Sequence, residues 1–254
     1  MNTKALLRRL ASYYPQRLRE SYDFGGLMAG TLPEETHSIL LCLDFDDEVL
    51  PQALKMRPDL IITHHPFFFG TRYQVLKNDP VKAALYEKVL REKLCILSYH
   101  TNFDAAPLGM NDELAEKLGL IDVKPLVTAP MARGGKLPET MEIRDFARYA
   151  KRKLGVNYGL LIPAGKPEIS SVALIGGGGW MENVNAQAEG YDIYLSGDCP
   201  HHGRREIVLR HYNYLDLPHE IEKAFMSRMT KTLLIIDQSL TISSIDHEQL
   251  PEVI

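Results

Sequence analysis

Residues 59–66 are Asp-Leu-Ile-Ile-Thr-His-His-Pro, and residues 94–98 are Leu-Cys-Ile-Leu-Ser. Each segment holds a short apolar run of the length of a buried strand, and residues 81–93 between them have the pattern of an amphipathic helix. A strand, a helix and a second strand in this order are typical of a βαβ unit, whose two strands are parallel. This stretch therefore predicts an α/β fold.

The same alternation of strands and helices continues along most of the chain. Further strands are expected at residues 39–43, 158–162, 172–175, 192–196 and 212–215. Helices are expected at residues 47–56, 112–118, 144–153, 181–189 and 202–210, with a final long helix that His219 opens. The first helix, near the N-terminus, would turn Leu6, Leu7 and Leu10 inward.

A segment rich in proline and glycine, residues 125–140, predicts a junction between two parts of the chain. We therefore expect two α/β lobes with mainly parallel sheets, an N-terminal lobe of residues 1–125 and a C-terminal lobe of residues 126–254. A single larger sheet is the alternative.

Composition excludes several classes of protein. The chain has 254 residues with 45% hydrophobic and 24% charged residues, as in an ordinary soluble protein. The formal net charge of −4 disfavours non-specific nucleic-acid binding, which requires the neutralisation of phosphates. Three cysteines without a CxxC pair are too few for a disulfide framework. No apolar run approaches the roughly 20 residues of a transmembrane helix, so we expect a cytoplasmic protein that does not cross a membrane.

Histidines gather where the expected strands end. Seven of the nine histidines lie in or near residues 64–66, 100–104, 197–202 and 218–222. In open α/β sheets, ligands bind beyond the carboxyl ends of the strands. These four segments are therefore the place to look for a functional site.

His64 and His65 directly follow a strand, and Pro66 ends the regular backbone there. The two imidazoles could each hold one of two metal ions, or one could be buried and hydrogen-bonded while the other is exposed. Asp104 supplies a carboxylate beyond another strand, as a metal ligand or as the start of an Asx turn. His100 is expected to orient Asp104 or a water molecule.

His219 and Glu222 are three residues apart at the start of a helix, so both side chains face the same side. Such a pair can present two metal ligands from one helix. The alternative role for Glu220 and Glu222 is compensation of the helix dipole in the first turn.

Three other segments admit two interpretations each. The four glycines 176–179 could bind an anion on backbone N–H groups or form a tight turn. Asp198, Cys199, His201 and His202 could form a second metal cluster, although cap and turn roles are more usual for such residues. The aromatic residues 67–69 could line a pocket for a flat base or belong to the core.

Four segments in order carry a resemblance to a known family. They are Gly-Gly-Leu-Met-Ala-Gly at 25–30, the segment 59–66, Ser-Tyr-His-Thr-Asn-Phe-Asp-Ala-Ala-Pro-Leu-Gly-Met-Asn-Asp at 98–112, and Tyr-Asp-Ile-Tyr-Leu-Ser-Gly-Asp at 191–198 with His201-His202 after it. Over nearly its whole length the chain resembles the short form of the Nif-three-like proteins with a dinuclear metal centre. These are often called GTP cyclohydrolase I type 2 homologues.

The resemblance implies a site for two divalent metal ions per chain, between the two lobes. The implied ligands are His64, His65 and Asp104 of the N-terminal lobe and His219 of the C-terminal lobe, together with a bridging glutamate. In the family this glutamate usually comes four residues after the last histidine, where this chain has Lys223. We predict Glu222 instead, because it shares a helix face with His219. His100, Asp198 and Glu220 are expected to support the ligands.

Histidine with carboxylate suits zinc, iron, manganese or nickel, and the sequence does not distinguish them. The function implied is a metal-dependent hydrolase for a nucleotide-like substrate, of the kind that opens the imidazole ring of GTP. No side chain is assigned a catalytic role, since metal-bound water would be the nucleophile. The resemblance also implies a toroidal homohexamer.

Two other functions stay open. One is a metal-binding hexameric scaffold or regulatory protein without turnover, in which the same ligands stabilise the assembly. The other is a ring that handles nucleic acid, which the acidic charge balance opposes.

Overall fold

The computed structural model describes residues 1–252, and in it the chain forms two compact units. The first unit comprises residues 1–106 and 225–248, and the second comprises residues 107–224 and 249–252. The lobes predicted from the sequence were divided at residue 125 instead. The chain returns to the first unit because its last helix and strand pack there. Each unit has its own sheet with helices beside it, so the predicted α/β class is confirmed.

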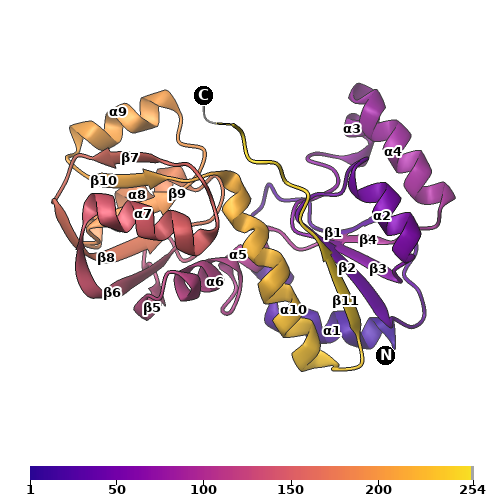
Figure 1. Cartoon of the computed structure of the whole chain (residues 1–254). Coiled ribbons are helices and arrows are strands. Elements are labelled where there is room, and N and C mark those ends of the chain that lie inside the picture. The colour runs from indigo at the N-terminus through magenta and orange to yellow at the C-terminus, as the bar shows by residue number, and fades with distance from the viewer. Residues whose placement is uncertain (253–254) are drawn as a thin grey trace. The chain divides into compact units, whose positions relative to one another are not determined.

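The first unit is built on a sheet of five strands (Figure 1). Their order is β1 (Gly26–Ala29), β4 (Ile96–Ser98), β3 (Leu60–Thr63), β2 (Ser38–Cys42) and β11 (Thr241–Ile245). The pairings from β4 to β11 are parallel, and β1 runs antiparallel to β4. Both faces of β3 are buried, as expected of a strand in a parallel sheet that helices cover on both sides.

The helices of the first unit are α1 (Thr3–Tyr13), α2 (Val49–Met56), α3 (Arg72–Asn78), α4 (Pro80–Arg91), α5 (Thr101–Ala105) and α10 (Ala224–Ile236), with a short 3₁₀ turn η1 (Gln16–Leu18). α2 and α4 share a core with Leu40 and Cys42 of β2. On the other side of the unit, the hydroxyl of Tyr14, the residue that follows α1, lies 2.6 Å from the hydroxyl of Thr232 on α10, and the two form a hydrogen bond between these helices (Figure 1).

The second unit contains a sheet of six strands. Their order is β5 (Ile121–Pro125), β6 (Arg133–Glu142), β8 (Glu168–Leu174), β9 (Ile193–Ser196), β10 (Asn213–Asp216) and β7 (Leu160–Pro163). Only β8, β9 and β10 pair in parallel, while the other neighbours are antiparallel. The expected mainly parallel pairing thus holds in the first sheet, whereas the second sheet is mixed.

The helices of the second unit are α6 (Met110–Lys117), α7 (Ile143–Leu154), α8 (Asn183–Ala188) and α9 (His201–Leu209), with 3₁₀ turns η2 (Trp180–Glu182) and η3 (His219–Lys223). α8 and α9 share one core, to which they contribute Ala186 and Ile207, with Tyr194 and Tyr214 of the parallel strands. In the part of the chain described, no helix has the length and apolar character needed to cross a membrane.

The segment that the sequence marked as a junction is mostly a hairpin of two strands, β5 and β6. The glycines of this hairpin allow neighbouring side chains to pack closely against the backbone, and they do not form a flexible link. A Cβ atom on Gly134 would lie 2.1 Å from the ring of Tyr191, and one on Gly135 would lie 3.0 Å from Leu120. Because glycine in a strand can mark either a bend or a close approach, composition alone could not separate the two.

In each unit, an aspartate that precedes one parallel strand forms hydrogen bonds to a serine on the neighbouring parallel strand. Asp59 precedes β3, and its Oδ2 accepts hydrogen bonds from the backbone N–H (2.8 Å) and hydroxyl (2.9 Å) of Ser38 on β2. Asp192 precedes β9, and its Oδ2 accepts hydrogen bonds from the backbone N–H (3.2 Å) and hydroxyl (3.1 Å) of Ser171 on β8. The serine hydroxyl also accepts a bond from the aspartate N–H in both places, at 3.1 Å and 3.0 Å.

The hydrogen bonds to Asp192 lower the pKa of its carboxyl group. Burial alone would raise the pKa of Asp192, but hydrogen bonds from Lys166, Ser170 and Ser171 outweigh it and lower the pKa to about 2. The ionised form of Asp192 therefore stabilises the fold of the second unit.

Candidate metal centre

Three histidines of the first unit lie together at the carboxyl ends of two parallel strands. His64 and His65 follow β3, and His100 follows β4. Their ring nitrogens include one atom from each residue that all lie within 4.8 Å of one another, a group that could hold a metal ion. The structure brings His100 into this cluster, whereas the sequence assigned it only a supporting role.

The turn after β3 places both neighbouring imidazoles inside the protein. The backbone N–H groups of His64 and His65 donate to the carbonyls of Cys42 and Leu43 at 3.3 Å and 3.0 Å, and the hydroxyl of Thr63 donates to the carbonyl of His65 at 2.7 Å. His64 is fully buried, and His65 is 9% exposed. The alternative with one buried and one exposed histidine is therefore wrong.

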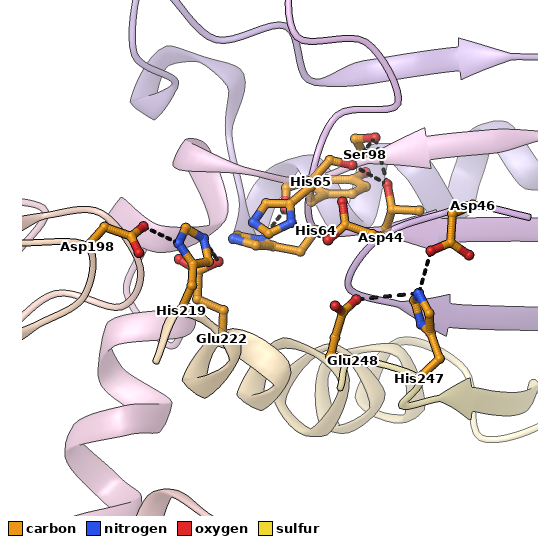
Figure 2. A network of polar contacts seen from close by, with 12 residues as sticks. Asp44, Asp46, His64, His65, Ser98, Asp198, His219, Glu222, His247 and Glu248 are labelled. Atoms are coloured by element: carbon orange, nitrogen blue, oxygen red, sulfur yellow. Dashed lines mark hydrogen bonds and ion pairs between the residues drawn. The ribbon is translucent and has the colours of Figure 1, made fainter. Parts of the chain in front are cut away.

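In both histidines Nδ1 forms a hydrogen bond to an oxygen atom, and Figure 2 shows this for His65. Nδ1 of His64 donates to the backbone carbonyl of Tyr99 at 2.9 Å, and Nδ1 of His65 donates to Oδ2 of Asp44 at 2.7 Å. A neutral imidazole that donates through Nδ1 keeps its lone pair on Nε2, which is the usual arrangement of a metal-binding histidine. Burial would raise the pKa of Asp44, but the hydrogen bond from His65 outweighs it and lowers the pKa.

His100 is oriented in the same way. Its Nδ1 donates to Oδ1 of Asp23 at 3.0 Å, and the other oxygen of Asp23 accepts from the hydroxyl of Thr101 at 2.6 Å. Burial alone would raise the pKa of Asp23, but the bonds from His100 and Thr101 hold the pKa well below its usual range. Asp23 is therefore an ionised acceptor that fixes the ring of His100.

Asp104 lies in α5 rather than in the Asx turn that the sequence left open. Its side chain is buried, and its Oδ1 lies 3.6 Å from Nε2 of His64. Two ligands of a tetrahedral zinc ion, each about 2.1 Å from the metal, lie about 3.4 Å apart. The separation of Asp104 and His64 therefore suits two ligands of one ion.

His219 and Glu222 of the second unit also present ligand atoms to each other. They lie in η3, and because side chains three residues apart eclipse in a 3₁₀ turn, Glu222 stands over His219. Nε2 of His219 lies 3.0 Å from Oε2 of Glu222, whose side chain is 5% exposed. Glu220 does not share this contact and lines a neighbouring pocket instead.

Asp198 supports His219 from the opposite side, as Figure 2 shows. Its Oδ2 accepts a hydrogen bond of 2.5 Å from Nδ1 of His219. Four histidines, His64, His65, His100 and His219, thus donate through Nδ1 to an oxygen atom, and in three of them that atom belongs to a carboxylate. Asp198 thus holds the ring of His219 in one orientation.

The glycine loop 176–179 packs against this pair of residues. Gly177 has a φ of +63°, and a Cβ atom there would lie 2.1 Å from Oε1 of Glu222 and 3.1 Å from Cε1 of His219. The loop therefore leaves room for the carboxylate of Glu222. Neither of the two interpretations made from the sequence, an anion-binding loop or a tight turn, predicted this contact of the glycines with Glu222.

A polar group from the end of the first unit lies beyond Asp44 (Figure 2). Nε2 of His247 lies 2.9 Å from Oδ2 of Asp46 and 3.6 Å from Oε1 of Glu248. Burial raises the pKa of Glu248, and the charges of Asp44 and Asp46 add to the effect. The segment after β11 thus adds a polar layer beside the acceptor of His65.

Two other candidates from the sequence do not gather into sites. Within residues 1–252, Asp198, Cys199, His201 and His202 form no group with ligand atoms within 4.8 Å of one another. Asp198 turns to His219, Cys199 is buried, His201 and His202 are exposed, and His202 contacts the ring of Trp180. The aromatic segment splits, since Phe67 and Phe68 are core residues and Phe69 is 65% exposed.

Asp44 and Asp23 were not predicted from the sequence, and of the two only Asp44 had a local signal. Asp44 follows β2 closely and so belongs to the same strand-end edge as His64 and His100. Asp23 precedes β1, and because β1 is antiparallel to β4, its beginning lies beside the end of β4. The pairing of β1 was needed to place Asp23 there.

The donor groups found in each unit suit a transition metal. Imidazole nitrogens with carboxylate oxygens are the ligand set of zinc, iron, manganese and nickel in proteins. The orientation of each ring and the short separations of His64–Asp104 and His219–Glu222 agree with that use. The residues present therefore fit a metal ion.

Comparison with known proteins gives several full-length relatives. A protein of Clostridium perfringens is 28% identical over 225 residues, which cover 86% of each chain, and a protein of Methanocaldococcus jannaschii is 27% identical over 254 residues, which cover 97% of this chain and all of the relative. Both bear the name GTP cyclohydrolase 1 type 2 homolog.

Solved structures share the fold. A crystal structure of a Bacillus cereus protein related to NIF3 matches with a TM-score of 0.89 at 21% identity, covering 100% of this chain and 99% of that one. Reduced HcgD from Methanocaldococcus jannaschii matches with a TM-score of 0.82 at 24% identity, covering 97% and 98%. The model of the family Duf34/NIF3 (NGG1p interacting factor 3) matches residues 1–251. The chain therefore belongs to the Duf34/NIF3 family.

Proposed function

We propose that this protein is a hydrolase that depends on two divalent metal ions and acts on a nucleotide-like substrate. The observation that carries the proposal is the orientation of the three proposed histidine ligands, His64, His65 and His219, each of which donates through Nδ1 to an oxygen atom, as metal-binding histidines usually do. The names of the relatives support a nucleotide, and opening of the imidazole ring of GTP is the first reaction to test.

The proposed ligands are those that the family resemblance implies. They are His64, His65, Asp104, His219 and Glu222. Two ions bound there would supply a nucleophile from water at neutral pH and would polarise the bond that is broken.

The chain's own residues would prepare this chemistry. Asp44 and Asp198 hold His65 and His219 in one tautomer and one orientation, so little reorganisation is needed when a metal binds. The carboxylates of Asp104 and Glu222 offset part of the positive charge. Because the side chains of Asp104 and Glu222 are buried, their electrostatic interactions with a bound ion would be stronger than in bulk water.

Metal content and turnover together test the proposal. Protein loaded with Mn²⁺, Zn²⁺ or Fe²⁺ would be assayed with GTP and a panel of nucleotides, and its metal would be counted by mass spectrometry. We expect two ions per chain and hydrolysis of at least one nucleotide. The double variant H64A/H65A should lose both metal and activity.

The chain offers a matched control for that variant. His201 and His202 are also adjacent histidines, but both are exposed and outside the proposed ligand set. H201A/H202A should therefore keep both ions and full activity. Equal metal content in the two double variants, or turnover that survives in H64A/H65A, would contradict the proposal. Metal binding without turnover of any nucleotide would favour a scaffold role.

We also propose a homohexamer in the cytoplasm, as the resemblance implies. The assembly is tested by light scattering coupled to size-exclusion chromatography. A mass of six chains is expected, and a stable monomer at micromolar concentration would refute the assembly. Cell fractionation tests the location.

A further inference from the structure

A pocket in the second unit lies where the parallel strands β9 and β10 end. Its volume is about 370 Å³, within the usual range for a small-molecule site, and its lining includes Tyr158, Asp198, Arg204, Asp216, His219 and Glu220. Carboxyl ends of parallel strands are where α/β sheets bind ligands. Because His219 lines the pocket, a ligand held there would lie beside a proposed metal ligand.

Asp216 is a buried carboxylate of this pocket, and its polar contacts are long. Its side chain is 10% exposed. Within residues 1–252, Oδ1 accepts one hydrogen bond, of 3.4 Å, from the backbone N–H of Cys199, and Oδ2 lies 3.9 Å from Nε of Arg204. That Nε has one hydrogen, which it donates to the carbonyl of Cys199 at 3.0 Å.

The acceptor capacity of Asp216 is therefore mostly unused. A carboxylate offers about four acceptor positions, and a buried one with so few bonds requires an explanation. Burial raises the pKa of Asp216, in accord with this shortage of donors. A ligand with N–H groups would satisfy both oxygens.

Charge around the pocket decides which class of ligand fits. Three carboxylates, of Asp198, Asp216 and Glu220, face one guanidinium, of Arg204. This balance opposes an anionic group such as a phosphate. Tyr158 also lines the pocket, and an aromatic ring can stack on a planar group.

We propose that Asp216 binds a planar ligand group with two adjacent N–H donors, through a paired hydrogen bond to its two oxygens. Amidines, guanidines and the edge of a 2-amino-6-oxopurine share this chemistry. The proposal rests on the proposed function, since it names the part of the substrate that this pocket selects.

The ligand series tests the proposal without changing the protein. Guanosine has the 2-amino group and inosine lacks it, while benzamidine has the donor pair without a purine. Binding of each compound to the metal-loaded protein would be measured by calorimetry. Hydrogen bonds to a charged group contribute about 1.5–3 kcal/mol, so we expect guanosine to bind about tenfold or more tightly than inosine.

Variants then assign the effect to one side chain. D216N should bring the ratio of the guanosine and inosine affinities to about one, while D122N, which removes an exposed aspartate elsewhere in the unit, should leave it unchanged. If benzamidine alone binds and depends on Asp216, the ligand is an amidine or guanidine rather than a purine. Equal affinities for guanosine and inosine with no binding of benzamidine would overturn the proposal. So would binding that D216N leaves intact.

This result is distinguishable from the outcome for the hydrolase. A failure of the proposed function appears as missing metal or missing turnover in the wild-type protein. Selective binding of guanosine or benzamidine that depends on Asp216 would survive that failure, and metal-dependent turnover without it would refute only the role of Asp216.

Discussion

Gly177→Ala places a methyl group between the glycine loop and the carboxylate of Glu222. In the structure a Cβ atom at this position would lie 2.1 Å from Oε1 of Glu222 and 2.9 Å from its Cδ. Those atoms are the far end of a flexible side chain, so the carboxylate would swing away while the backbone stays in place. The substitution therefore displaces a proposed metal ligand without removing it.

The substitution has two separate effects, one on folding stability and one on metal affinity. Gly177 has a φ of +63°, and an L-residue in the left-handed region loses about 1–2 kcal/mol of folding stability. Displacement of Glu222 acts on metal binding instead. Loss of a group that only supports a ligand weakens metal affinity about ten- to hundredfold, so displacement of the ligand itself should weaken it by at least that factor.

Gly190 offers a matched control. Its φ is +86°, and a Cβ atom there would meet nothing within 4 Å. Gly190→Ala therefore carries the backbone cost alone. Urea unfolding should show a similar loss of stability in both variants, and a competition titration with a chelator should show weaker metal binding only in Gly177→Ala.

Metal binding by the two alanine variants can refute the role of Glu222 as a ligand. If both alanine variants bind metal as the wild-type protein does, the carboxylate of Glu222 is not a ligand in the position described. A tenfold loss of affinity in Gly190→Ala would instead show that general strain in the second unit, rather than the contact with Glu222, controls the metal.

Three further predictions concern individual carboxylates. Glu222→Gln should lose one ion per chain and Glu220→Gln none, as counted by mass spectrometry, and the reverse result would assign the bridge to Glu220. Asp44→Asn should weaken metal binding about ten- to hundredfold in a chelator competition, whereas Asp47→Asn, which removes an exposed ion pair with Lys88, should leave it unchanged. Asp192→Asn should lower the unfolding free energy by about 1–2 kcal/mol at pH 7. Because the pKa of Asp192 is about 2 in the fold and about 3.9 in the unfolded chain, this difference should shrink as the pH falls from 4 toward 2 in urea titrations, and a constant difference would contradict it.

Local patterns predicted much of the fold and of the site. Apolar runs with a helix between them were enough to place β3 and β4, and the rule that ligands bind at strand ends led to His64, His65 and Asp104. These signals are short in range, because each depends on residues that are neighbours in the sequence.

Features that depend on distant pairing were not visible in the same way. β11 joins the sheet by pairing with β2, about 200 residues earlier, and its short sequence Thr-Ile-Ser-Ser-Ile has little apolar content of its own. Asp23 reaches His100 only because β1 is antiparallel to β4. The 3₁₀ form of η3, which sets Glu222 above His219, is likewise a property of the packed chain.

The hydrogen bonds that Asp59 and Asp192 accept have a consequence for the behaviour of the protein in acid. In each unit an aspartate before a parallel strand accepts hydrogen bonds from the backbone N–H and the hydroxyl of a serine on the preceding strand. Burial alone would raise the pKa of both carboxyl groups, but hydrogen bonds outweigh it and lower both pKa values. Protonation of the two aspartates therefore weakens the sheet of each unit, so that acid destabilises both units and not one alone.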